Sequence, residues 1–192
     1  MKGIVSEIDL RKRNGQVMVN KGEKYSFKEL DFVDKSEFNN LKVGDYLMFN
    51  LGKDINKKIA VECKKTTDEL KDYLIKKALV AQSIASEYDE FCDNVLAYAK
   101  RLGDFGVTTS MIRRIYSRIL SANSVSELKF LRPQFAYTAG KNIDNPVLKE
   151  FMEILDTLVK NMEVDNESDL KKFKKFMEAI VAYRKYVGED NN

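Results

Sequence analysis

The sequence predicts an α+β protein in which a small five-stranded β-barrel, residues 1–65, precedes a five-helix bundle, residues 66–192. Two observations support this division. Short β-type runs alternate with turn signals before residue 65, whereas apolar residues recur at helical spacing after it. In addition, 44% of the 192 residues are hydrophobic and 33% are charged, which is enough to fill a core and to solvate the surface around it.

Five β-strands are expected in the first 65 residues. The dipeptides Asn14-Gly15 and Lys21-Gly22 indicate turns between strands. The predicted strands span residues 3–8, 16–20, 24–30, 46–51 and 58–63. So many short strands in so short a segment favour a small barrel.

Five helices with short connections are expected after residue 65, and short connections favour a compact antiparallel bundle. Thr108 or Thr109 is predicted to cap the second helix, because a threonine hydroxyl can accept a hydrogen bond from a free backbone N–H there. Gly140 is predicted to end the third helix in the left-handed conformation, and Pro146 to begin the fourth. The predicted breaks lie at residues 103–106, at 122–124, after Gly140 and at 164–168, and the last helix ends near Gly188.

Part of the N-terminal segment resembles a cold-shock domain of the OB fold. The resemblance is carried by Lys2-Gly3-Ile4-Val5, Asn14-Gly15-Gln16-Val17-Met18-Val19, Tyr25-Ser26-Phe27 and Leu41-Lys42-Val43-Gly44-Asp45-Tyr46-Leu47-Met48-Phe49. Cold-shock domains stack unpaired bases on aromatic side chains of two neighbouring strands. The resemblance implies an accessory contact to nucleic acid from Tyr25 and Phe27, whereas Gln16 and Met18 stand where the family has phenylalanine.

Two interpretations stay open for each candidate contact in the barrel. Tyr25 and Phe27 alternate along a strand, and alternating aromatic residues also pack the inside of a barrel. Arg11, Lys12 and Arg13 precede the Asn14-Gly15 turn, where they could meet a phosphate or be solvated as an ordinary surface cluster.

Three helical segments resemble the small helical subunit of the type III-A CRISPR effector, the Csm complex. The resemblance covers residues 98–188 and is strongest over residues 131–142. The segments read Thr108-Thr109-Ser110-Met111-Ile112-Arg113-Arg114-Ile115-Tyr116, Leu131-Arg132-Pro133-Gln134-Phe135-Ala136-Tyr137-Thr138-Ala139-Gly140-Lys141-Asn142 and Phe176-Met177-Glu178-Ala179-Ile180-Val181-Ala182-Tyr183-Arg184-Lys185-Tyr186.

This resemblance implies RNA binding without catalysis, with target RNA, CRISPR guide RNA, other Csm subunits and further copies of the chain as partners. Arg113, Arg132 and Lys141 match the cationic positions of the family's segments. Gln134 and Met111 stand where relatives often have lysine, and Arg114, Arg118 or Lys100 is predicted to compensate for the missing contacts. The alternative for Arg113 and Arg132 is a salt bridge within the bundle.

Three tyrosines of the helical part could either contact RNA or lie in the core. Tyr137, Tyr183 and Tyr186 could stack on bases, but tyrosines at helical spacing among apolar residues more often line a core. We therefore expect these three side chains to be core residues.

The distribution of charge limits how nucleic acid could be bound. The net charge is +3, and residues 1–65 carry 14 basic and 10 acidic residues, leaving 19 of 33 basic and 20 of 30 acidic residues for the helical part. Because the helical part is nearly neutral, RNA binding there requires a localised cationic patch.

Composition excludes several kinds of chemistry. The chain has no histidine, and its two cysteines, Cys63 and Cys92, lack CxxC spacing, so a zinc site, a disulfide framework and a serine–histidine triad are not expected. We expect no enzyme activity and no cofactor. No apolar run reaches the roughly 20 residues of a membrane helix, and the N-terminus lacks a signal peptide, so the cytoplasm is the expected location.

The alternative function is a standalone cold-shock-type chaperone of single-stranded RNA with a helical dimerisation domain.

Overall fold

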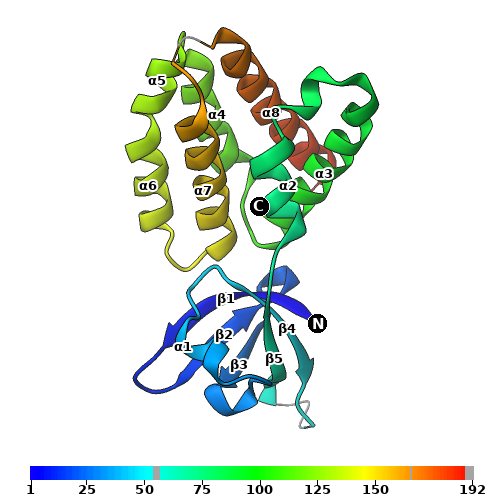
Figure 1. Cartoon of the computed structure of the whole chain (residues 1–192), viewed down its shortest axis with the longest axis vertical. Helices are drawn as coiled ribbons and strands as arrows, with labels where there is room; N and C mark the ends of the chain where they lie inside the picture. Colours follow the sequence, from blue (N-terminus) through cyan, green and yellow to red (C-terminus); the bar gives the residue numbers. More distant parts are fainter. Residues whose placement is uncertain (54–56, 165, 189–192) are drawn as a thin grey trace. The chain divides into compact units, whose positions relative to one another are not determined.

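The computed structural model describes residues 1–53, 57–164 and 166–188 and divides the chain into two compact units (Figure 1). One unit consists of Met1–Asp68 with Ile143–Val147, and the other of Glu69–Asn142 with Leu148–Asn192. The first is built on a β-sheet and the second on α-helices, so the predicted α+β class is confirmed.

The first unit contains a five-stranded antiparallel sheet, as predicted. Its strand order is β3-β2-β1-β4-β5. Pairing is irregular between Val5 and Glu7 of β1 and between Met48 and Asn50 of β4, and such bulges bend a sheet. The sheet curls into a half-barrel. The strands are β1 (Lys2–Asp9), β2 (Asn14–Met18), β3 (Lys24–Lys28), β4 (Tyr46–Leu51) and β5 (Ala60–Thr66), and a short helix α1 (Ser36–Asn39) lies between β3 and β4 in the chain.

Aromatic side chains fill the inside of this sheet. Phe27 of β3 packs edge-on against Phe32 and Phe38, with ring centroids 5.6 and 6.3 Å apart. Gly15 of β2 allows this packing, because a Cβ atom there would lie 2.6 Å from the Phe27 ring and 2.5 Å from the carbonyl oxygen of Glu7. Asn14 and Gly15 therefore belong to strand β2, and the turn predicted at this pair lies at residues 10–13 instead.

Cys63 of β5 is fully buried in the same core, and its burial gives a testable prediction. Burial, reinforced by the negative charge of Asp31, raises the pKa of the Cys63 thiol to about 12. Because the thiolate is the reactive form, we expect Cys63 to resist a disulfide reagent in mildly alkaline buffer. In a Cys92→Ala variant, no thiol should react until guanidinium unfolds the chain. Rapid reaction of that variant in native buffer would contradict the assignment of Cys63 to the core.

The second unit packs around its last helix. Helix α8 contacts both α3 and α4, and its buried apolar side chains are Leu170, Phe173, Phe176, Met177 and Ile180. The helices of this unit are α2 (Glu69–Lys77), α3 (Ala85–Asp104), α4 (Thr109–Ser121), α5 (Val125–Phe130), α6 (Arg132–Lys141), α7 (Pro146–Asn161) and α8 (Glu167–Tyr186).

The expected count of five helices is wrong, because the described residues of this unit form seven α-helices. The predicted first helix is interrupted after Lys77 by a 3-10 turn, Ala81–Ser83. The Gln82 amide donates to the carbonyl oxygens of Ala78 and of Lys172 in α8, at 2.6 and 3.0 Å. A contact distant in sequence therefore holds this break, and helical periodicity could not reveal it.

The predicted third helix is also divided, and its end was misplaced. Pro133 lies in the first turn of α6, and a proline has no N–H with which to continue the preceding helix α5. Gly140 does not end α6 in the left-handed conformation: the helix continues to Lys141, and Gly140 is not among the glycines with positive φ. The prediction for Gly140 was therefore wrong.

The break between α3 and α4 is held by a buried cation. Arg184 of α8 is 2% exposed, and its guanidinium donates to the carbonyl oxygens of Val107 and Gly188, each at 3.0 Å. A Cβ atom on Gly103 would lie 3.1 Å from that guanidinium, so glycine makes room for it. Arg184 thereby supports the turn that leads into α4.

Candidate nucleic-acid interface

Helix α4 buries its isoleucines on one face and exposes its arginines to solvent. The Thr108 hydroxyl accepts a hydrogen bond from the Met111 N–H at 3.2 Å, which confirms the predicted cap. The isoleucines of α4 are buried, whereas Arg113, Arg114 and Arg118 are exposed. Arg114 and Arg118 are four residues apart and therefore share one face of the helix.

A groove between α4 and α6 brings this face together with part of the predicted RNA-binding segment. We call it the α4–α6 groove. It encloses about 210 Å³. Its lining residues are Met111, Arg114, Ile115, Arg118, Leu131, Gln134, Phe135, Tyr137, Thr138, Lys141, Asn142 and Leu148.

The groove has an apolar floor and a cationic rim. Ile115, Phe135 and Leu148 are 8%, 3% and 0% exposed, so they form the floor. Arg114, Arg118 and Lys141 are exposed at the rim, and no carboxylate is among the groove residues that the structure describes. The groove is thus a localised cationic patch on a nearly neutral helical unit.

Gln134 orients one of the rim cations. Its side-chain oxygen accepts a hydrogen bond from the Arg118 guanidinium. A guanidinium has five N–H donors, so Arg118 keeps donors for a ligand after this bond is made. Gln134 on α6 therefore fixes the position of the Arg118 side chain on α4. This role was not predicted from the sequence, in which Gln134 was interpreted as a replacement for lysine.

Arg132 lies on another face of α6 and is paired within the helical unit. Its guanidinium donates two hydrogen bonds to the Asp156 carboxylate of α7, at 2.7 and 3.0 Å. The hydrogen bond to Asp156 raises the pKa of Arg132. Arg132 lines a separate hollow between α6 and α7 together with Glu153 and Asp156. The salt-bridge alternative therefore holds for Arg132.

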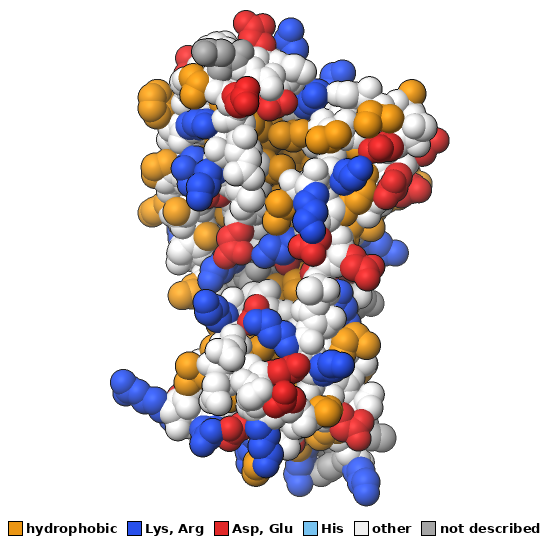
Figure 2. Space-filling view, in the orientation of Figure 1, with side chains coloured by type: hydrophobic (Ala, Val, Ile, Leu, Met, Phe, Trp, Pro, Cys, Tyr) orange, Lys and Arg blue, Asp and Glu red, His pale blue; other side chains and the backbone are white. Residues whose placement is uncertain are grey.

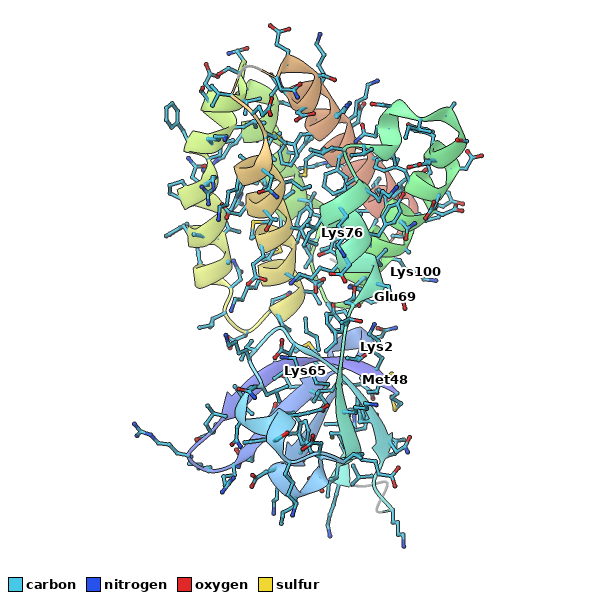
Figure 3. All side chains as sticks on the ribbon, viewed as in Figure 1. Lys2, Met48, Lys65, Glu69, Lys76 and Lys100 are labelled. Carbon is cyan, nitrogen blue, oxygen red and sulfur yellow. The ribbon has the colours of Figure 1, made fainter. Side chains whose placement is uncertain are left out.

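Two further predicted cations lie outside the α4–α6 groove. Arg113 is exposed on α4 but does not line the groove. Lys100 is exposed on α3, on the opposite side of the helical unit from α6 (Figure 3). Basic side chains do lie along the edge formed by α5 and α6, with hydrophobic side chains beside them (Figure 2).

The basic cluster of the half-barrel is partly neutralised. Arg11, Lys12 and Arg13 are exposed in the turn between β1 and β2. The Lys12 ammonium lies 3.7 Å from Asp9, and Arg13 forms an ion pair with Glu29. Backbone N–H groups of Lys12 and Arg11, at 2.9 and 3.0 Å, also donate to Asp9, and the bond from Lys12 is the main cause that lowers the Asp9 pKa.

The two aromatic candidates of the half-barrel are core residues. Tyr25 is 8% exposed and Phe27 is 1% exposed, and both belong to the core of the sheet. A base cannot stack on a ring that is buried in this way. Of the two interpretations left open for these residues, packing is the correct one.

The opposite correction applies to two tyrosines of the helical unit. Tyr137 and Tyr186 are 70% and 78% exposed, so the expectation that they line a core is wrong. Tyr183 is only partly buried and is not one of the buried core residues. Tyr137 lies three residues from Gln134 and four from Lys141, which places all three on one helical face, and this spacing is the sequence signal for its place beside them.

Comparisons with known proteins identify the family of the helical part. The model of the Csm2 type III-A family matches residues 85–190, more than half of the chain. The chain belongs to the Csm2 family of type III-A CRISPR systems. It is 33% identical over 96 residues to a Streptococcus thermophilus protein described as "CRISPR system Cms protein Csm2", an alignment that covers 45% of this chain and 77% of the relative. No solved structure matches the chain.

The Csm2-family segment contains the whole α4–α6 groove. It also contains every helical residue predicted to contact RNA, namely Lys100, Arg113, Arg114, Arg118, Arg132, Gln134 and Lys141. The half-barrel lies before the matched residues, and so do Arg11, Lys12, Arg13, Tyr25 and Phe27.

The described residues offer neither a membrane-spanning helix nor a cluster of metal ligands. Among the described residues, no helix has the length and apolar character needed to cross a membrane. The cysteine and carboxylate residues that the structure describes include no group of three that could hold a metal ion.

Proposed function

We propose that the chain is a non-catalytic small subunit of a type III-A CRISPR Csm complex that binds the backbone of target RNA paired with guide RNA. The α4–α6 groove carries this proposal. It gathers three cations without a carboxylate inside the segment that matches the Csm2 family. The hollow between α6 and α7 is a useful contrast, because Glu153 and Asp156 there offset the charges of Lys129 and Arg132.

The chemistry of the rim suits a subunit that must accept any guide. Arginine offers forked donors to phosphate oxygens, and lysine offers a mobile positive charge. Contacts of this kind set the position of the RNA backbone but do not read its sequence. Arg114, Arg118 and Lys141 are therefore the proposed phosphate contacts, with Arg113 beside them on α4.

The half-barrel, residues 1–65, is proposed as an OB-like accessory domain and residues 66–192 as the small-subunit domain. The OB-like assignment is supported by strand order, by the helix between β3 and β4, and by parallel bridges from Ser26 to Ile59 and from Phe32 to Cys63, which bring the β3 and β5 sides of the sheet together. Tyr25 and Phe27 are buried and cannot stack on a base. Within the basic turn, Lys12 and Arg13 each lie beside a carboxylate, so the exposed Arg11 is the residue best placed for docking. The standalone chaperone is not favoured by membership of the Csm2 family.

Purification from the host tests this proposal directly. Tagged chain should bring down guide RNA, other Csm subunits and further copies of the untagged chain, because a small subunit acts only within its complex. Mass spectrometry and RNA sequencing of the purified material measure both kinds of partner.

The same experiment on a variant separates assembly from RNA contact. With Arg114, Arg118 and Lys141 replaced by alanine, the Csm subunits should still copurify while retention of added target RNA falls. Recovery of a dimer with neither guide RNA nor Csm subunits would support the chaperone alternative instead.

A further inference from the structure

The α4–α6 groove contains an aromatic side chain, Tyr137, that has no role in binding phosphate groups. Tyr137 lines the groove and is 70% exposed, and no ring pair among the described residues includes it. An aromatic ring that is held at a cationic rim and left open to solvent is the arrangement on which single-stranded nucleic acids stack.

The positions on α6 place this ring between polar groups of the same face. Gln134, Tyr137 and Lys141 follow one another at intervals of three and four residues, and all three line the groove. The rise of an α-helix spreads them over about 10 Å. Arg114 and Arg118 stand on the opposite wall, on α4. A ligand at Tyr137 would thus have a cation within reach on both walls.

The floor of the groove favours a ligand with an apolar flat face. Ile115, Phe135 and Leu148 are buried beneath the rim, and a charged phosphate gains nothing from them. The volume of about 210 Å³ is smaller than the roughly 300–1,000 Å³ of a site that encloses a whole small ligand. The groove therefore fits part of a larger molecule, with a flat apolar group attached to anionic ones.

A paired nucleotide cannot supply that flat face. In an A-form duplex the bases are stacked on one another and show only their edges in the grooves, whereas unpaired bases can be splayed out onto aromatic side chains. We infer that the α4–α6 groove takes an unpaired nucleotide of the bound RNA, with its base on Tyr137 and its neighbouring phosphates on Arg114 and Lys141. This inference rests on the proposed function of the same groove.

A Tyr137→Ala variant of the full chain tests the inference. Its affinity for a labelled single-stranded RNA should fall by roughly 5- to 150-fold, the equivalent of the about 1–3 kcal/mol that one stacked base contributes. Affinity for a blunt RNA duplex of equal length should not change. Tyr137→Phe keeps the ring and should bind the single strand nearly as well as the unaltered chain, and Tyr186→Ala, which removes another exposed tyrosine, should have no effect.

Two further measurements separate stacking from charge. The unaltered chain should bind a ribose-phosphate oligomer without bases no better than Tyr137→Ala binds ordinary RNA. The slope of log affinity against log salt should be the same for Tyr137→Ala as for the unaltered chain, because no phosphate contact is lost.

The outcomes distinguish this inference from the function on which it rests. If Tyr137→Ala binds single strands normally, or weakens duplex and single strand equally, the inference is overturned while the phosphate contacts stand. If replacement of Arg114 and Lys141 leaves the salt slope unchanged, the RNA-binding role of the groove fails, and the inference fails with it.

Discussion

Replacing Arg114, Arg118 and Lys141 together with alanine is expected to flatten the dependence of RNA affinity on salt. Each phosphate contact to a single strand contributes about 0.7 to the slope of log affinity against log salt, so the slope should fall by roughly 2. Between about 50 and 200 mM salt, the affinity of the unaltered chain should therefore drop roughly twentyfold more than that of the variant. Fluorescence anisotropy with a labelled single-stranded RNA measures both slopes.

The control for this result removes the same amount of charge from elsewhere in the helical unit. Lys129, Arg132 and Lys160 lie outside the α4–α6 groove, and Arg132 is already paired with Asp156. Their replacement by alanine should leave the salt slope nearly unchanged. Equal flattening in both variants would mean that total charge drives binding, and an unchanged slope in the groove variant would remove these three residues from the interface.

Glu150→Ala is expected to destabilise the helical unit more than any surface substitution. Glu150 of α7 is 1% exposed, and its carboxylate accepts hydrogen bonds from the Tyr98 hydroxyl at 3.1 Å and from the Arg101 guanidinium at 3.2 Å. Removing one partner of a buried ion pair typically costs about 3–5 kcal/mol, and the lower end of that range is expected here because the remaining Arg101 side chain is 18% exposed. Urea denaturation followed by circular dichroism should show a lower midpoint.

Glu153→Ala on the same helix is the matched control. The Glu153 side chain is 51% exposed and lies 3.3 Å from the Lys71 ammonium. An exposed ion pair of this kind contributes about 0–1 kcal/mol. Equal midpoints for the two variants would show that Glu150 does not stabilise the fold as a buried acceptor.

Parts of the fold that depend on nearby residues could be predicted from the sequence. Alternation and turn residues located the five strands, and Thr108 was among the predicted caps of α4. The interruption after Lys77 could not be predicted, since the Gln82 amide that stabilises it bonds to the backbone of Lys172, 90 positions away. Local spacing carries no information about such a partner.

The candidate site was predictable to a similar extent. The sequence identified the cation-bearing segments but not which cations share a groove. Arg132 and Gln134 are two positions apart on α6 and therefore point in different directions, one to Asp156 of α7 and the other to Arg118 of α4. Buried Tyr25 and exposed Tyr137 show the same difficulty for aromatic residues.

The sequence by itself determined the α+β class, the five strands, the start of α4 and the segments that place the chain in the Csm2 family. These features arise from propensity, periodicity and capping, which act over a few residues. Tertiary structure alone decided that Arg114, Arg118 and Lys141 meet at one groove, that Arg132 is paired elsewhere and that Tyr137 is open to solvent. The physical reason is that the placement of α4 beside α6 depends on how their apolar faces pack within a common core, and that packing is set by contacts between residues far apart in the chain.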